Sequence, residues 1–232
     1  MIYERGNAAK QWMLSELDRR FGARAFRVLD LAGGSGRIWE TFLKTHPNVH
    51  VIVVDTDASA ITKGKEMYGA NNQIKLRVAD AQHPVEGSFD VVTAMSAIEH
   101  VVDRPAFLKT VWSALSSNGV SYLNYDVGHF RSHDIKERLM VPLSQVLAFF
   151  KIEGPYMKKV DDALFRHQAE SIGFKIEKTT KHNLHPMKGF LRGAKDESLE
   201  AWFAFEDSLN AHYSPEKLDH VMWSTTLIVT KP

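Results

Sequence analysis

The 232-residue chain contains no cysteine. This absence excludes disulfide bonds, thiolate metal sites and a cysteine nucleophile, and it fits a reducing compartment. The sequence also lacks any apolar run that approaches the ~20 residues of a membrane-spanning helix. Its first residues, MIYERGNAAKQW, have no apolar core of a signal peptide. From these absences we expect a soluble, cytoplasmic protein without a membrane partner.

An excess of charge of one sign is missing as well, because 29 Lys and Arg residues accompany 28 Asp and Glu residues. This balance removes the usual electrostatic argument for a nucleic-acid partner. Hydrophobic residues make up 44% and charged residues 25% of the chain, which is ordinary for a globular protein. The length suffices for one sizeable core and is short for two. We therefore expect a single domain over residues 1–232 that has no nucleic-acid partner.

Short apolar segments alternate with amphipathic ones along the chain. The segments typical of buried strands are 26–31, 51–54, 74–78, 89–94, 120–125, 174–179 and 223–229. Helices are expected at 4–21, 37–44, about 61–67, from Asp103 to Asn118-Gly119, up to Gly173 and at 199–209. The inner face of the helix that ends at Gly173 is predicted to be Val160, Leu164, His167 and Ile172. This alternation predicts an α/β fold in which helices cover both faces of a parallel sheet.

Two long connections interrupt the alternation, at about residues 128–157 and 181–220. Residues 140–150 in the first, MVPLSQVLAFF, are too apolar for a solvated loop, so we expect them to fold over something. They could cover the end of the sheet as core, form a lid over a substrate, or do both. Long loops at the working end of a scaffold commonly carry specificity. The residues expected to contact a substrate are Phe149, Phe150 and Tyr156.

A glycine-rich turn follows the first predicted strand, in the sequence VLDLAGGSGR of residues 28–37. Small residues allow a ligand to approach the backbone, and N–H groups at the start of the next helix face it. The second strand ends at Asp55, where a carboxylate can accept both hydroxyls of a ribose. The pair indicates a nucleoside ligand, although the turn alone could be a tight strand-to-helix connection. A dinucleotide fingerprint starting at Gly34 would need glycine where this chain has Trp39, which argues against NAD.

With these motifs the sequence resembles the class I S-adenosylmethionine-dependent methyltransferases over about residues 25–180. Their first motif, hydrophobic-hydrophobic-Asp-hydrophobic-Gly-x-Gly-x-Gly, matches residues 28–36 except that Ala32 replaces the first glycine. The family's adenine-binding acid falls on Asp80, and its F-D-x-V pattern falls on residues 89–92. The resemblance implies a Rossmann-like, doubly wound and mostly parallel seven-stranded sheet, with an antiparallel last strand and helical lid insertions.

The resemblance also implies S-adenosylmethionine as the cofactor. The residues that would contact this cofactor are Asp30, Ala32, Gly33, Gly34, Gly36, Asp55, Thr56, Asp80, Ala81, Met95 and Ser96. Methyl transfer is an in-line displacement at a sulfonium carbon, and aligning the reactants contributes up to about 7–11 kcal/mol in well-oriented systems. A proton acceptor is needed only for a nucleophile such as a phenol or an ammonium.

Two side chains are the catalytic candidates. His100 lies in the stretch SAIEHV, which is like the vleHv of many small-molecule members of the family, and Tyr125 ends the fifth strand. A purely structural role is an open alternative for each. No metal is expected, because His129 and His133 have metal-like spacing but no third ligand is in view.

The leading interpretation is an enzyme that methylates an N-, O- or C-nucleophile of a small molecule. A macromolecular methyltransferase, a non-catalytic S-adenosylmethionine-binding protein and, more distantly, an NAD-dependent oxidoreductase are the alternatives. Methyltransferases that act on amino groups of DNA bases or glutamine carry Asn/Asp-Pro-Pro-Tyr/Phe after the fourth strand. This chain has MSAI at residues 95–98, which argues against that branch.

Basic residues concentrate in the two long connections. Residues 128–159 hold six basic and three acidic residues, and residues 181–195 hold four basic residues, Lys188 and Arg192 among them, and no acid. A cleft rimmed by one sign of charge concentrates ligands of the opposite sign. We therefore expect an acceptor that carries a carboxylate, a phosphate or an acidic phenol, unless these side chains are ordinary solvated ones.

Overall fold

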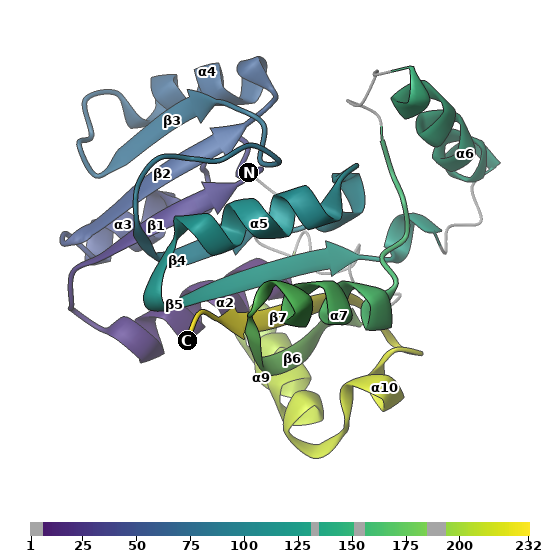
Figure 1. Ribbon diagram of the computed structural model, residues 1–232. Helices are drawn as coiled ribbons and strands as arrows, with labels where there is room; N and C mark the ends of the chain where they lie inside the picture. The colour runs from purple at the N-terminus through teal and green to yellow at the C-terminus, as the bar shows by residue number, and fades with distance from the viewer. Residues whose placement is uncertain (1–6, 131–134, 151–155, 185–193) are drawn as a thin grey trace.

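The computed structural model describes residues 7–130, 135–150, 156–184 and 194–232. Within them a seven-stranded sheet has the strand order β3-β2-β1-β4-β5-β7-β6 (Figure 1). The strands are β1 (Phe26–Leu31), β2 (Val49–Asp55), β3 (Ile74–Val78), β4 (Phe89–Ala94), β5 (Leu115–Asp126), β6 (Lys175–Leu184) and β7 (Met222–Thr230). The first five strands are parallel, whereas β7 is antiparallel to both of its neighbours. The predicted fold class and the antiparallel last strand are confirmed.

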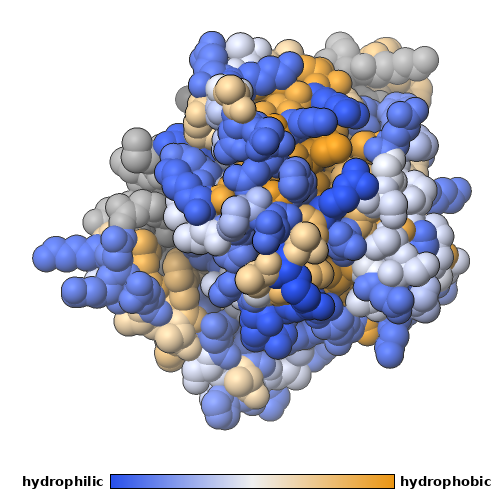
Figure 2. All heavy atoms as spheres, turned by 90° about the vertical axis from the view of Figure 1, so that its left-hand side faces the viewer, coloured by the Kyte–Doolittle hydropathy of each residue, from blue (hydrophilic) through white to orange (hydrophobic). Residues whose placement is uncertain are grey.

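Helices cover both faces of the sheet. The helical elements are α2 (Ala8–Phe21), α3 (Trp39–Thr45), α4 (Ala58–Tyr68), η1 (Ile98–His100), α5 (Arg104–Ala114), η2 (Gly128–Phe130), α6 (Ile135–Phe149), α7 (Asp162–Ile172), α9 (Asp196–His212) and α10 (Pro215–Leu218). Apolar side chains of α2, α3 and α4 pack on one face, and those of α5 and α7 pack on the other. The β3 side of the molecule is mostly hydrophilic, with apolar atoms visible between the charged side chains (Figure 2). None of the helices described is both long and apolar enough to cross a membrane.

The structure corrects two helix predictions. Helix α5 ends at Ala114 rather than at Asn118-Gly119, because the backbone at Leu115 already pairs with Phe89 of β4. Helix α7 buries Phe165 and Ala169, while the predicted inner residue Leu164 is exposed. Val160 lies outside the helix, because the Asp161 side chain accepts a hydrogen bond from the Leu164 N–H and caps the helix start, and Phe165 and Ala169 pack in the core instead.

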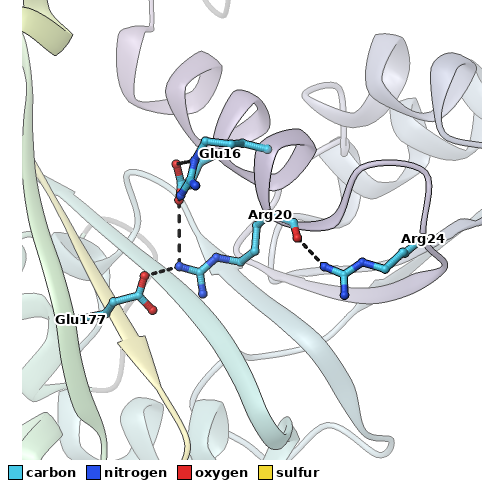
Figure 3. Close-up of polar contacts among 5 residues, drawn as sticks. Glu16, Arg20, Arg24 and Glu177 are labelled. Carbon is cyan, nitrogen blue, oxygen red and sulfur yellow. Dashed lines mark hydrogen bonds and ion pairs between the residues drawn. The ribbon is translucent and has the colours of Figure 1, made fainter.

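Helix α2 is fixed against the far end of the sheet by charged side chains. Arg20 bridges Glu16 of the same helix and Glu177 of β6, as Figure 3 shows. Trp12 lies one helical turn before Glu16, and the Lys178 ammonium of β6 lies 5.6 Å from the centre of its ring. These contacts join the start of the described chain to its sixth strand. Trp12 also lies against Tyr122 of β5, so α2 contacts more than one strand.

Helix α9 covers the edge of β6, where a sheet would otherwise present unpaired backbone groups. The Asn210 amide accepts from the Lys181 N–H at 2.8 Å and donates to the Lys181 carbonyl at 2.7 Å. One turn earlier, Glu206 accepts from the N–H groups of Asn183 and Leu184. Covering an edge in this way prevents pairing with another chain. The second predicted lid segment, 181–220, is thus corrected in part: its first residues complete β6, and its helix lies on the sheet edge.

Replacing Asn210 with Ala should remove both bonds to Lys181 and leave its buried backbone groups without partners. We expect a loss of about 1–3 kcal/mol in the free energy of unfolding, measured by chemical denaturation. Ser208→Ala, an exposed change on the same helix, should stay within about 0.5 kcal/mol of the wild type. Equal stabilities for the two variants would contradict the role of α9 at this edge.

Candidate functional site

The glycine loop after β1 has a conformation and a packing that require small residues. A Cβ at Gly33 would lie 2.3 Å from Asp30 Oδ2 and 2.8 Å from Val53 Cγ1, so only glycine fits. Gly34 and Gly36 have φ values of +59° and +69°, in the left-handed region. A Cβ at Gly34 would meet nothing within 4 Å. The backbone at Gly34 therefore faces open space, as a ligand-binding loop requires.

Ala32, the residue that departs from the glycine motif, also has a positive φ, of +55°. This conformation costs a residue with a Cβ roughly 1–2 kcal/mol. The position thus has the backbone that glycine would favour, although the side chain is alanine. Backbone strain of this kind clusters at functional sites.

Asp55, at the end of β2, turns its carboxylate towards the glycine loop. Oδ2 accepts from the Gly34 N–H at 2.7 Å, and Oδ1 accepts from the Asp57 N–H at 2.8 Å. Each carboxylate oxygen can accept a further hydrogen bond, and the residue is only half-buried. The two backbone bonds orient the group, while its remaining acceptor capacity suits a diol. Thr56, the next residue, is exposed.

Asp30 lies inside the protein, where its carboxylate is used by two internal donors. It is 2% exposed, and its two oxygens accept from the indole N–H of Trp39 and the hydroxyl of Thr93, both at 2.8 Å. Burial raises the pKa of Asp30 to about 6. Sequence reasoning took Asp30 as a cofactor contact and missed the roles of Trp39 and Thr93. The one available signal was that a buried tryptophan needs a partner for its N–H.

The loops after β3 and β4 lie at the same edge of the sheet. Asp55 pairs with Val78, and the Ala79 N–H donates to the Asp55 carbonyl, so Asp80 and Ala81 follow directly beside β2. The Asp80 carboxylate is half-buried and accepts from the Gln82 N–H at 2.8 Å. After β4, Met95 is buried and Ser96 is half-buried. The structure thus brings the predicted cofactor residues to the carboxyl ends of four adjacent strands.

His100 is the last residue of η1, and hydrogen bonds join η1 to the chain at Tyr156 and Lys158. Its side chain is exposed, and Nδ1 lies 3.0 Å from the Tyr156 carbonyl oxygen, to which it donates in the Nδ1-protonated tautomer. The Lys158 N–H donates to the Glu99 carbonyl at 2.9 Å. Arg104 adds a bond from its Nε to the Ile98 carbonyl. The structural role that the sequence left open for His100 is therefore present, and its catalytic role stays a prediction.

Tyr125 lies in the core under α7. It is 1% exposed, its ring centre is 5.7 Å from that of Phe165, and its hydroxyl bonds to Asp162. Burial raises the pKa of Tyr125 well above its ordinary value, and the nearby carboxylate acts in the same direction. A neutral phenol cannot take up a proton as a base. This environment favours a structural role, and the catalytic role of Tyr125 stays a prediction.

The apolar run 140–150 does not cover the end of the sheet as core, which was one of the two roles expected for it. It forms most of α6, which stands away from the sheet (Figure 1). Phe149 is 84% and Phe150 67% exposed, so neither side chain is core, and their contact with a substrate stays a prediction. Hydrogen bonds between Ser144 and the backbone of Met157 attach the helix to the chain beyond it. Tyr156, by contrast, is buried.

The basic residues expected at the cleft include one that is buried and others that lie outside the described residues. Lys181 is buried and bonds to Thr225 Oγ1 at 2.7 Å, with Asp162 and Asp219 as ionic partners. It is an internal charge and not a rim charge, because β6 runs further than predicted and includes it. Lys188 and Arg192 lie outside the described residues, as does His133. Over the described ranges no group of three His, Asp or Glu side chains is arranged to hold a metal.

The buried carboxylate of Asp30 makes stability depend on pH. Its pKa of about 6 lies above the ordinary value of 3.8, so the stabilising contribution is fully present below the unfolded pKa of about 4 and is lost as pH rises through about 6. Asn at position 30 keeps an acceptor for Trp39 and a donor for Thr93 but has no charge. Relative to Asp30→Asn, the wild type should lose roughly 2–3 kcal/mol of unfolding free energy between pH 4 and 7, measured by urea denaturation. Parallel pH profiles would contradict this account of Asp30.

Comparison with known proteins supports the assignment of the fold. Residues 29–121 match a family model described as a methyltransferase domain. The chain is 29% identical over 119 residues to the ubiquinone/menaquinone biosynthesis C-methyltransferase UbiE of Dinoroseobacter shibae, covering 49% of this chain and 48% of that protein. It is 28% identical over 135 residues to the tRNA 5-carboxymethoxyuridine methyltransferase of Escherichia coli, covering 54% and 51%. The chain thus matches about half the length of each of these relatives.

A solved S-adenosylmethionine-dependent methyltransferase from Mesorhizobium loti has the same fold, with a TM-score of 0.64, 17% identity, and 96% of this chain and 98% of that chain covered. The strand order, the glycine loop and the acids that follow β2 and β3 agree with these similarities. Residues 29–121 thus match the methyltransferase domain family, and the described fold is that of a solved S-adenosylmethionine-dependent methyltransferase.

Proposed function

We propose that this chain transfers the methyl group of S-adenosylmethionine to a small-molecule acceptor. The observation that carries the proposal is the bond between Asp55 Oδ2 and the Gly34 N–H. This bond places an oriented carboxylate beside a loop whose backbone faces open space. A nucleoside with a free ribose diol fits that combination, since carboxylate and backbone N–H groups are complementary to it.

The cofactor would be held by residues of the four strand ends. Asp55 would accept the ribose hydroxyls, Asp80 and the Ala81 N–H would bind the adenine edge, and the backbone of residues 32–36 would face the amino-acid portion. When bound, S-adenosylmethionine supplies an activated methyl group with a positive sulfonium. Asp30 contributes by fixing the loop from behind, because its carboxylate is used by Trp39 and Thr93.

The residues of this chain would accelerate the transfer chiefly by alignment. Holding two reactants in line contributes more than any single side chain in most such reactions. His100, exposed at the end of η1 and oriented by the Tyr156 carbonyl, would take a proton from an acceptor that must lose one. Phe149 at the end of α6 and the following Phe150, both exposed, would close on the acceptor and exclude water.

A small molecule is the acceptor class we favour, and an anionic group on it would suit the basic connections. Similarity to a C-methyltransferase of quinone biosynthesis supports a small molecule. Similarity to a tRNA methyltransferase supports an RNA acceptor as the second candidate. Assays with labelled S-adenosylmethionine against total tRNA and against a panel of carboxylates, phosphates and phenols separate the two. Labelled tRNA with an inert panel would favour the second candidate.

Asp55→Ala should weaken binding of S-adenosylhomocysteine by about 1.5–3 kcal/mol, the range for hydrogen bonds to a charged group. That is roughly a 10- to 100-fold higher Kd in calorimetry. Asp57→Ala is the matched control, because its carboxylate caps α4 by accepting from Ser59 and Ala60 and does not face the loop. Unchanged affinity in a folded Asp55→Ala protein would remove the ribose assignment.

His100→Ala should lower kcat at least tenfold for an acceptor that must lose a proton, because general-base catalysis typically contributes about 100-fold or more. The Kd for S-adenosylhomocysteine should stay near the wild-type value. His167→Ala, an exposed histidine on α7, serves as the control in the same steady-state assay. A kcat within about twofold of the wild type would exclude His100 from the mechanism.

Phe149→Ala and Phe150→Ala should raise the KM for the acceptor severalfold and leave S-adenosylhomocysteine affinity unchanged. Both side chains are exposed, so their removal should hardly change the melting temperature. Tyr156 is buried, and Tyr156→Phe is the change that tests its contact without a cavity. If KM stays constant in all three variants, the aromatic residues of this segment do not contact the acceptor.

A further inference from the structure

A buried asparagine joins the cofactor edge to the far strands of the sheet. Asn124 of β5 has no exposed surface. Its Oδ1 accepts from the Ser96 N–H at 3.0 Å and from the Ser96 hydroxyl at 3.3 Å. Its Nδ2 donates to Ser224 Oγ, Thr226 Oγ1 and the Thr225 carbonyl at 2.9–3.0 Å. Every polar atom of the side chain amide is therefore used.

The orientation of this amide is unambiguous. One side faces a backbone N–H, which can only donate, and the other faces a backbone carbonyl, which can only accept. Neither aspartate nor leucine can satisfy both sides. Fully satisfied buried polar groups make a structure rigid and unique, and here the rigidity applies to the turn after β4.

Ser96, the residue held by Asn124, has a strained backbone. Its φ is +59°, in the region that residues other than glycine and asparagine rarely adopt. The other non-glycine residues described with positive φ are Ala32, Asn118 and Asn183. Two of these are asparagines, which tolerate this conformation. Ala32 and Ser96 are not asparagines. They follow the adjacent strands β1 and β4, at the edge of the sheet where the cofactor is proposed to bind.

We propose that Asn124 is a positioning residue that holds Ser96 in its left-handed conformation and so prepares the turn 95–97 for S-adenosylmethionine. Strain at such a site persists only when its surroundings determine it. Asn124 fixes the turn through two groups. Its side chain accepts from Ser96, and its backbone carbonyl accepts from the Ala97 N–H at 3.3 Å. The inference rests on the proposed function, since it names the ligand that the turn would meet.

The test compares Asn124→Ala in the wild type and in a Ser96→Gly background. Glycine adopts positive φ without strain, so it should remove most of the need for Asn124. We expect Asn124→Ala to raise the Kd for S-adenosylhomocysteine at least tenfold alone and no more than about threefold beside Ser96→Gly. Thr226→Val, which removes one acceptor on the far side of the amide, should lower the melting temperature without changing this Kd.

Hydrogen exchange in the ligand-free protein gives a readout that is independent of binding. The Ser96 amide should lose protection in Asn124→Ala and keep it in Thr226→Val. If the alanine variant does not fold, Asn124→Asp keeps the acceptor towards Ser96 and opposes only the Thr225 carbonyl. It should therefore lose stability but keep Ser96 protected, and a loss of that protection would contradict the proposal.

The outcomes distinguish a failure of the role of Asn124 from a failure of the proposed function. If Asn124→Ala and Thr226→Val lower stability alike and leave Kd unchanged, Asn124 is a packing residue only. The same conclusion follows if Ser96→Gly does not reduce the effect of Asn124→Ala. If the folded wild type binds no S-adenosylhomocysteine, the proposed function fails. Retained Ser96 protection would then show a held turn that does not serve this cofactor.

Discussion

The buried carboxylate of Asp30 is the interaction on which the cofactor edge depends. It joins β1 to Trp39 at the start of α3 and to Thr93 of β4. The backbone of Gly33 passes so close to it that a Cβ there would overlap Asp30 Oδ2. The direction of the glycine loop, and with it the bond from Gly34 to Asp55, follows from this internal anchor. Burial disfavours the ionised carboxylate and raises its pKa, yet two directed hydrogen bonds offset part of that penalty.

The same edge concentrates the strain of the described backbone. Ala32 and Ser96 have positive φ after neighbouring strands, and Ser96 is held by Asn124 from outside its own loop. At this edge the strain lies beside backbone that faces open space, at Gly34. Stability from the rest of the sheet, closed at β6 by Glu206 and Asn210, maintains this local arrangement. The fold thus stabilises a site that its local sequence alone would not favour.

Much of the fold could be predicted from the sequence, because buried parallel strands read as short apolar runs and glycine marks where they end. The strands at 74–78 and 89–94 agree with the structure at both ends. The predicted face of α7 was less accurate, because Asp161 caps the helix after Val160 and the core takes up Phe165 and Ala169. The inward turn of Asp30 and the role of Asn124 could not be predicted, because each depends on a distant partner. Thr93 is 63 positions from Asp30, and Ser224 is 100 positions from Asn124. The exposure of Phe149 was missed because apolar composition indicates burial without saying what provides it.

The central claim is that one nucleoside site lies over the ends of β1 to β4. A crystal structure with S-adenosylhomocysteine tests it most directly. The account predicts both ribose hydroxyls within about 3 Å of the Asp55 carboxylate, a typical hydrogen-bond distance. It also predicts the adenine beside Asp80 and Ala81 and the Gly34 backbone against the ligand. A ligand bound elsewhere, or an Asp55 carboxylate that contacts no ribose oxygen, would contradict the account.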